Sequence, residues 1–128
     1  MVLYLDSMVP VFLAEGTGGY FKGRNPNVPV DVLECNWVQG TPVTYIGKAG
    51  GSTSNATLRS RVRQYLRFGQ GNNVGHWGGR YIWQLENTDN LAVCWKFVTD
   101  EEPREIESRL IQMFISDFGK RPFANLSN

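Results

Sequence analysis

The pattern of apolar and polar positions divides the chain into an irregular beginning and a better patterned remainder. Glycines and prolines interrupt residues 1–31 too often for any period to emerge, so we expect short strands and loops there. We interpret this stretch as an N-terminal extension to a core domain over 32–126. No apolar run reaches the roughly 18 residues that cross a bilayer, so no membrane span is expected.

Two runs of β-branched and aromatic residues at the start of this core domain predict a β-hairpin. The runs are 32–38 and 43–49, and a Gln-Gly-Thr-Pro turn separates them. If the turn centres on Gly40, Cys35 and Tyr45 are both five residues away from it. The hairpin would therefore place Cys35 across from Tyr45, with both side chains on one face of the sheet.

A helix over about 57–68 is predicted by an apolar stripe and by the N-cap candidates before it. The stripe consists of Leu58, Val62, Tyr65 and Leu66, and the cap candidates are Ser54, Asn55 and Thr57. A glycine-rich loop over 69–79 follows. The next segment, 80–85, reads "RYIWQL" and is compatible with either a strand or a helix.

The last third of the chain predicts one more strand and one more helix. Residues 91–98 ("LAVCWKFV") are typical of a strand. A long helix begins between Asp100 and Pro103, runs to about Asp117 and stops at Gly119. Together the elements predict one α/β or α+β domain, with a small antiparallel sheet of about three strands flanked by helices.

Charge is distributed unevenly although the net charge of the 128 residues is only +1. Residues 41–80 contain six basic side chains and no acidic one. Such a block favours a polyanionic partner, and an ordinary solvated basic helix explains it equally well. The N-terminus does not resemble a signal peptide, and two cysteines are too few for a disulfide scaffold, so we expect a cytoplasmic protein.

A carboxylate falls on the apolar side of the last predicted helix. At about 100° per residue, Glu107 projects near the middle of an arc of apolar side chains. The arc contains Ile106, Leu110, Ile111, Met113, Phe114, Ile115 and Phe118. A carboxylate there must be paired or bound to a cation, because burying it alone is costly. Both a structural ion pair and a functional site fit this position.

The first predicted helix separates its arginines onto two sides. Arg59, Arg63 and Arg67 recur every four residues and form a basic row, which either follows phosphates or faces water. Arg61 projects elsewhere, one turn before Tyr65 at the margin of the apolar stripe. From there a guanidinium can bind a phosphate or a carboxylate, or cover an aromatic ring with its stem.

The residues and motifs that most other catalytic mechanisms require are missing from this sequence. His76 is the single histidine, and no zinc motif, phosphate-binding Walker loop or serine-nucleophile motif occurs. A metal here would be a hard cation such as Mg²⁺, held by few protein oxygens together with water and substrate phosphate.

Several short motifs together resemble the GIY-YIG nuclease family over residues 32–126. They are "YIGKA" at 45–49, "LRSRVRQYL" at 58–66, "REIESRLIQMF" at 104–114 and "PFANL" at 122–126. The resemblance implies a small nuclease core similar to that of excision-repair, homing and some restriction endonucleases. It also implies DNA as partner and a single divalent cation, Mg²⁺ or Mn²⁺, as cofactor.

The resemblance assigns roles position by position. Glu107 would hold the metal, Arg61 would neutralise the scissile phosphate, and Tyr45 would accept a proton from the attacking water. Tyr65 and His76 are further candidates for handling that proton, Lys48 matches the lysine after YIG, and Asn125 would position Glu107 or substrate. The row of Arg59, Arg63 and Arg67 would contact the DNA backbone, assisted by Arg80.

The family's first motif, Gly-Ile-Tyr, lies about ten residues before YIG on the preceding strand. In this sequence Cys35 stands ten residues before Tyr45, so the expected hairpin places a thiol where the family has a phenol. Tyr45 would then act as base alone. The alternative function is a nucleic-acid-binding module that has this fold and no activity.

Overall fold

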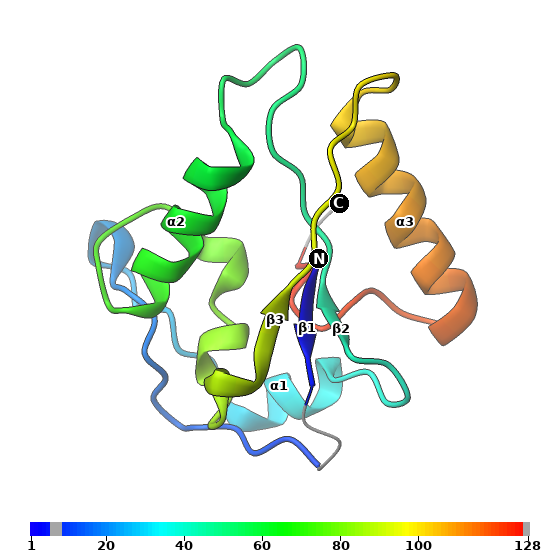
Figure 1. Cartoon of the computed structure of the whole chain (residues 1–128). Helices are drawn as coiled ribbons and strands as arrows, with labels where there is room; N and C mark the ends of the chain where they lie inside the picture. Colours follow the sequence, from blue (N-terminus) through cyan, green and yellow to red (C-terminus); the bar gives the residue numbers. More distant parts are fainter. Residues whose placement is uncertain (6–8, 127–128) are drawn as a thin grey trace.

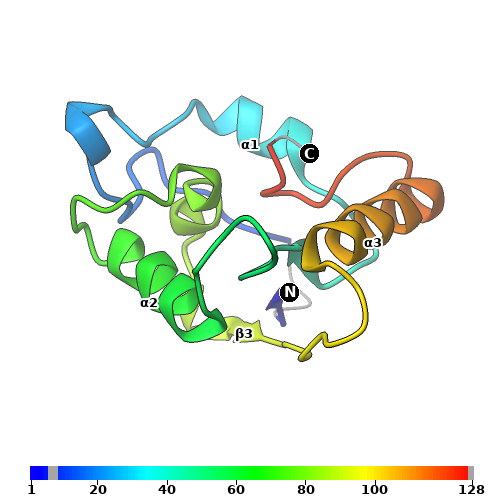
Figure 2. The same cartoon turned by 90° about the horizontal axis from the view of Figure 1, so that it is seen from above.

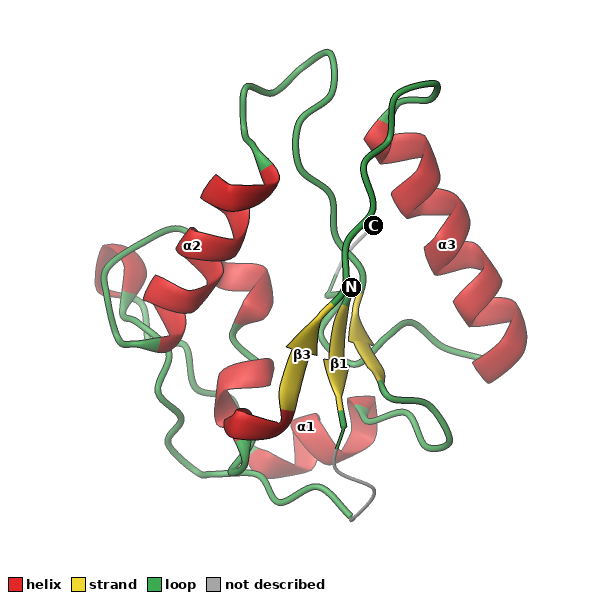
Figure 3. Ribbon diagram, viewed as in Figure 1, coloured by secondary structure: helices red, strands yellow, loops and turns green. Residues whose placement is uncertain are grey.

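The computed structural model describes residues 1–5 and 9–126, and it confirms an α+β fold built on a three-stranded antiparallel sheet (Figures 1 and 3). The strands are β1 (Val2–Tyr4), β2 (Val43–Tyr45) and β3 (Leu91–Val93), in the order β2-β1-β3. The α-helices are α1 (Val30–Asn36), α2 (Leu58–Gly69) and α3 (Pro103–Phe118). Short 3₁₀ turns, η1 (Phe21–Gly23), η2 (Trp77–Gly79), η3 (Ile82–Gln84) and η4 (Thr88–Asn90), connect them.

The first strand of the chain lies in the middle of the sheet, so residues 1–31 are not an extension to a separate core. Val2 faces Tyr45 on β2 and Val93 on β3 across antiparallel pairings. Val2 and Tyr4 are both buried. A strand of three residues is too short for its alternation to stand out from the glycine-rich sequence after it, which is why the pattern missed it.

The predicted hairpin is wrong, because residues 30–36 form helix α1 and β2 pairs with β1 instead. Pro29 precedes the helix and Asp31 lies in its first turn, as helix starts favour. Leu33 is fully buried and Trp37 packs beside it on the core, a spacing typical of a helix. Cys35 is consequently exposed on α1 rather than opposite Tyr45.

Helix α2 forms where the sequence predicts it, and a capping box fixes its start. The Thr57 hydroxyl accepts a hydrogen bond from the Ser60 amide, and the Ser60 hydroxyl accepts one from the Thr57 amide. Tyr65 and Phe68 are buried, whereas Leu66 is exposed, so the stripe continues through 68 and 69 rather than 66. Gly69 is required there, because a Cβ would lie 2.2 Å from the Trp83 ring.

Helix α3 also matches its prediction. Pro103 occupies its first turn, and Gly119 ends it in the left-handed conformation with φ of 78°. Ile111 and Phe114 are buried against Val38 and Ile46, forming the smaller of two apolar clusters. Glu107 lies half-buried on the same side of the helix, as the projection predicts, whereas Met113 is exposed.

The remaining segments are shorter than predicted. β2 and β3 each span three residues, and 80–85 is neither a strand nor an α-helix but contains η3. The larger apolar cluster joins the β1 strand, α1, α2 and the segment around η3. Seen from above, α2 and α3 flank the loop that follows β2 from opposite sides (Figure 2).

Candidate functional site

A pocket of about 180 Å³ brings together four residues that the sequence predicts as catalytic. They are Tyr45 at the end of β2, Lys48 in the following loop, Arg61 in α2 and Glu107 in α3. The rest of the lining is small, consisting of Ala49, Gly50, Ser54 and Ala56. Both helices point their N-terminal ends toward the side of the molecule where this loop lies (Figure 1). The lining thus combines two cations, one carboxylate and one phenol.

Tyr45 reaches the pocket because the residue two positions later has no side chain. The Tyr45 ring lies over Gly47, where a Cβ would be 2.6 Å from the ring carbon Cε1 and 2.9 Å from the hydroxyl oxygen. Any other residue at position 47 would displace the phenol. The glycine of the YIG motif therefore has a direct steric role in placing the tyrosine.

The electrostatic environment of Tyr45 disfavours loss of the hydroxyl proton. Burial raises the pKa of Tyr45 above its usual value, and the Glu107 carboxylate raises it further. Arg61 acts in the opposite direction with a smaller effect. The Tyr45 hydroxyl is therefore protonated at neutral pH. Neutralising Glu107 would remove the second largest cause of the raised pKa and leave burial, the largest cause, opposed by Arg61.

Glu107 is the acidic group of this pocket. Burial raises its pKa, while Lys48, Arg61 and Arg104 each lower it to a lesser extent. No described residue forms a salt bridge with Glu107, since the ion pair recorded among residues 1–5 and 9–126 joins Arg109 and Glu101 on the surface. The carboxylate is thus available for a ligand.

The side chains of the pocket fit a hard divalent cation that takes most of its ligands from water and phosphate rather than from the protein. Within the described part of the chain, no three His, Cys, Asp or Glu side chains cluster, so a fully protein-ligated metal is not built here. Glu107 is the carboxylate in the pocket lining. One carboxylate oxygen ligand, with water and phosphate oxygens completing the shell, is a common arrangement for Mg²⁺.

Tyr65 and His76 pack behind Tyr45, with His76 in edge-to-face contact with both tyrosine rings, and they do not line the pocket. The ring centroids of Tyr65 and His76 are 4.4 Å apart, and those of Tyr45 and Tyr65 are 6.0 Å apart. Burial raises the pKa of Tyr65 well above its usual value and lowers that of His76 to about 4. Both groups are neutral at pH 7, and a histidine with this pKa is a weak base. Their positions behind Tyr45 indicate that Tyr65 and His76 hold its ring in place.

Asn125 holds the backbone beside Tyr45 rather than Glu107. Its side-chain oxygen accepts a hydrogen bond of 2.9 Å from the Ile46 amide, and its nitrogen donates one of 2.8 Å to the Ile46 carbonyl. Next to it, the Ala124 amide donates to the Thr44 carbonyl. The buried C-terminal segment therefore clamps the end of β2, where Tyr45 lies, and the backbone that leads to Gly47.

The row of Arg59, Arg63 and Arg67 lies on another side of α2, as the helical projection predicts. All three side chains are exposed. They line a second, larger hollow together with residues of η1 and of the loop after α2. Arg61 is separate from this row, and its Nη1 lies 3.4 Å from Oε1 of Gln64.

Arg80 does not join this row. Its guanidinium carbon lies 4.7 Å from the Trp77 ring centroid, and Nη1 donates a hydrogen bond to the Trp77 carbonyl. Arg24 stacks on the same indole at 4.8 Å. Burial lowers the pKa of Arg80, Tyr81 acts in the opposite direction to a lesser extent, and repulsion from Arg24 lowers the pKa slightly further. This arginine therefore fixes the glycine-rich loop through cation–π contacts.

Two residues of the pocket wall were not predicted from the sequence as part of the site. Ser54 and Ala56 line the pocket through the loop after β2, and Glu102 fixes this loop by accepting a hydrogen bond from the Ser52 amide. Gly51 permits this approach, with φ of 101°. The run of small residues "AGGST" is the signal of a close loop, although it does not reveal the helix to which the loop is attached.

Comparison of the chain with protein-family models, curated proteins and solved structures finds no match. Among the described residues, no helix has the length and apolar character needed to cross a membrane.

Proposed function

We propose that the protein is a metal-dependent endonuclease that hydrolyses DNA phosphodiester bonds in the Tyr45–Glu107 pocket. The observation that carries the proposal is that one pocket is lined by Tyr45 and Lys48 from the end of β2 and its loop, by Arg61 from α2 and by Glu107 from α3. Two cations beside one carboxylate leave an excess of positive charge, which favours a phosphate. The resemblance of these residues to the GIY-YIG pattern supports the same activity.

The residues divide the work of phosphate hydrolysis as follows. Arg61 and Lys48 bind the non-bridging oxygens and stabilise the charge that develops on them. Glu107 supplies the protein ligand for a divalent cation, which when bound polarises the phosphate and stabilises the leaving oxygen. Tyr45 orients the attacking water with its hydroxyl. To act as a base it first loses its own proton to solvent, which neutralisation of Glu107 favours, and the phenolate then takes the proton of the attacking water. The clamp of Asn125 on Ile46 keeps this hydroxyl in place.

A nucleic-acid-binding module without catalysis is the second candidate. The observation that favours it is the raised pKa of Tyr45, because a phenol that holds its proton tightly is a poor base. Tyr4, at the end of the strand that pairs with β2, does not replace Tyr45 as the base. Its ring is buried against Trp37 at a centroid distance of 5.8 Å, and it does not line the pocket.

Nicking of supercoiled plasmid in Mg²⁺ or Mn²⁺, with and without EDTA, separates the two candidates. We expect cleavage that EDTA abolishes and that Glu107→Gln also abolishes. Glu105→Gln is the matched control, because Glu105 lies two residues earlier on α3, is exposed and does not line the pocket. It should cut at the wild-type rate.

Absence of cutting by the wild-type protein with either metal would contradict the endonuclease proposal and favour the binding module. Cutting by Glu107→Gln at the wild-type rate would show that Glu107 is not the metal ligand.

A further inference from the structure

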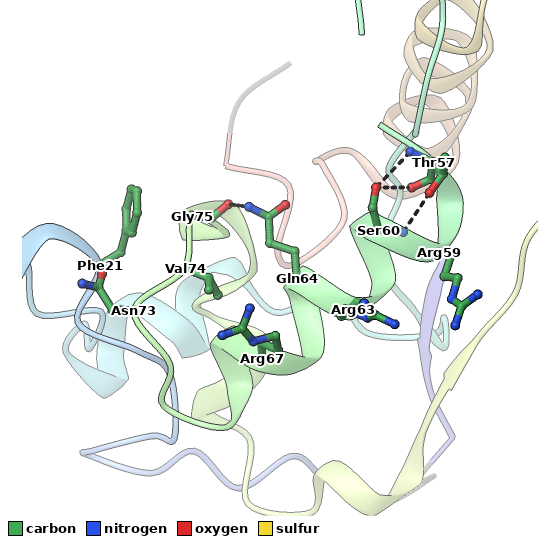
Figure 4. Close-up of a pocket in the computed structure, with 10 residues that line it drawn as sticks. All are labelled: Phe21, Thr57, Arg59, Ser60, Arg63, Gln64, Arg67, Asn73, Val74 and Gly75. Atoms are coloured by element: carbon green, nitrogen blue, oxygen red, sulfur yellow. Dashed lines mark hydrogen bonds between the residues drawn. The ribbon is translucent and has the colours of Figure 1, made fainter. Parts of the chain in front are cut away.

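A second hollow, of about 800 Å³, lies beside α2 on a different side of this helix from Arg61. One wall is formed by α2 residues, among them Arg59, Arg63 and Arg67. The opposite wall comes from Phe21 in η1 and from the loop containing Asn73 and Gly75 (Figure 4).

The charge of this hollow is entirely positive. Its lining contains three arginines and no carboxylate. Within residues 1–5 and 9–126, none of these guanidinium groups has a hydrogen-bond or ion-pair partner among the side-chain contacts of the structure. Successive arginines are four residues apart, or about 6 Å along the helix axis. A row of cations with this spacing can contact several phosphates of one nucleic-acid strand.

Phe21 is an aromatic ring that the core does not use. It belongs to neither apolar cluster, although it is only half-exposed. Its ring rests on the loop after α2, where a Cβ at Gly75 would lie 3.3 Å from Cζ of Phe21. The Lys22 amide donates a hydrogen bond of 3.1 Å to Asn73 and ties η1 to the same loop. The ring is thus held in the wall of the hollow, with the Lys22 ammonium 5.3 Å from its centroid.

We propose, building on the endonuclease function, that this hollow binds a single-stranded segment of the DNA substrate. Arg59, Arg63 and Arg67 contact the backbone, and one unpaired base stacks on Phe21. A duplex offers its phosphates to the exposed arginines, but its bases remain stacked on each other and cannot reach a ring inside the wall. A positive groove with an aromatic platform is the usual means of binding single strands.

Binding is measured by fluorescence anisotropy in EDTA, so that cleavage does not enter. The probes are a short labelled oligonucleotide and the duplex of the same sequence. We expect the wild type to bind the single strand more tightly than the duplex. Phe21→Ala and Phe21→Leu should each weaken single-strand binding about tenfold, in line with the loss of one stacked base, and should leave duplex binding unchanged.

Two features make the comparison specific to the ring. Phe21→Leu keeps apolar bulk at the site and removes only the aromatic face, and unchanged duplex binding shows that it is folded. Tyr20→Ala is the matched control, since Tyr20 is an exposed neighbouring aromatic that does not line the hollow. It should bind both probes as the wild type does.

Equal or tighter binding of the duplex by the wild type would overturn the inference, as would wild-type single-strand affinity in both Phe21 variants. Plasmid nicking together with either of these results would refute the single-strand site and leave the endonuclease intact. Loss of single-strand binding in the Phe21 variants of a protein that cuts no DNA would refute the endonuclease and support the single-strand site.

Discussion

The hydroxyl of Tyr45 is the phenol oxygen of the pocket, and its placement depends on very local chemistry. The absence of a side chain at Gly47 leaves room for its ring, and Tyr65 and His76 pack behind it. Tyr45→Phe keeps these ring contacts and removes only the oxygen. The variant therefore isolates the contribution of the hydroxyl to hydrolysis.

We predict that Tyr45→Phe lowers the cleavage rate about 100-fold, within the range for loss of a general base. The measurement is single-turnover cleavage of plasmid at saturating metal. Cys35→Ala, on the exposed surface of α1, should retain the wild-type rate. Equal rates for Tyr45→Phe and the wild type would remove Tyr45 from the mechanism.

The stability of the protein should respond to Glu107 in the direction set by its raised pKa. Between the usual value of 4.5 and the raised one, the folded protein binds more protons than the unfolded chain, so the free energy of unfolding falls as pH rises through that window. Glu107→Gln removes this charge. We predict an unfolding free energy at pH 7 equal to or slightly above that of the wild type.

The advantage of Glu107→Gln should disappear below pH 4.5, where both proteins are neutral at this position. Urea unfolding at pH 7 and pH 4 checks the prediction. A variant that is much less stable at pH 7 would show that the carboxylate has a structural ion-pair role instead.

Helix α2 presents different chemistry on two of its sides, and the element as a whole should separate affinity from rate. Arg61 lines the pocket that contains Tyr45 and Glu107, whereas Arg59, Arg63 and Arg67 line the second hollow. We predict that Ala at any one position of the row weakens DNA binding. It should also flatten the plot of log K against log salt by about one unit or less, as loss of one phosphate contact does.

Arg61→Ala should instead lower turnover at saturating DNA and leave the salt slope nearly unchanged. Binding is followed by anisotropy at several salt concentrations, and turnover by plasmid nicking. The reverse assignment of the two phenotypes would mean that the row, and not Arg61, contacts the scissile phosphate.

The end of β2 depends on a segment about 80 residues away in sequence, through the clamp of Asn125 on Ile46. Asn125→Ala leaves one buried amide and one buried carbonyl without a partner. Each such group costs about 1–3 kcal/mol, so we predict a loss of roughly 2 kcal/mol or more in the free energy of unfolding.

Asn36→Ala is the control for this comparison, because Asn36 also donates to a backbone carbonyl but is exposed on α1. It should change stability by less than about 0.5 kcal/mol. Urea unfolding of both variants provides the measurement. Similar losses in the two variants would show that the clamp has no special importance.

Elements with a clear period and terminal signals are predictable from the sequence, and very short ones are not. α2 and α3 have apolar stripes and recognisable caps, and both form where predicted. α1 has only two helical turns, and its apolar residues also alternate well enough to imitate a strand. β1 has three residues, and only its pairing with β2 and β3 reveals that it is central.

At the scale of the whole molecule, only the part of the candidate site that depends on helical geometry and motif spacing was predictable from the sequence. These placed Arg61 and Glu107 on the inward sides of two helices, and the fold brings them into one pocket. They did not reveal that Asn125 binds Ile46, nor that Phe21 lines one hollow with the arginine row. Both arrangements bring together segments about 40 or more residues apart, and such arrangements depend on the packed fold.

The response of the whole molecule to acid should be governed partly by His76. This side chain is buried between Tyr65 and Gly79, and burial lowers its pKa to about 4 from the usual 6.5. The unfolded chain therefore binds this proton first as the pH falls. Linkage then requires the free energy of unfolding to decrease between about pH 6.5 and pH 4, by about 3 kcal/mol at most.

We predict that His76→Gln lacks this component, because glutamine does not titrate. Carboxylates titrate in both proteins, so the difference between their unfolding free energies isolates the histidine. Urea unfolding at pH 7, 6, 5 and 4 should show the wild type losing stability faster than the variant, with the two curves converging or crossing as pH falls. Parallel curves would show that His76 accepts its proton as readily in the folded protein as in the unfolded chain. His76 would then carry a charge in mild acid beside Tyr65 and Tyr45. The conclusion that two uncharged side chains support the Tyr45 ring would be wrong.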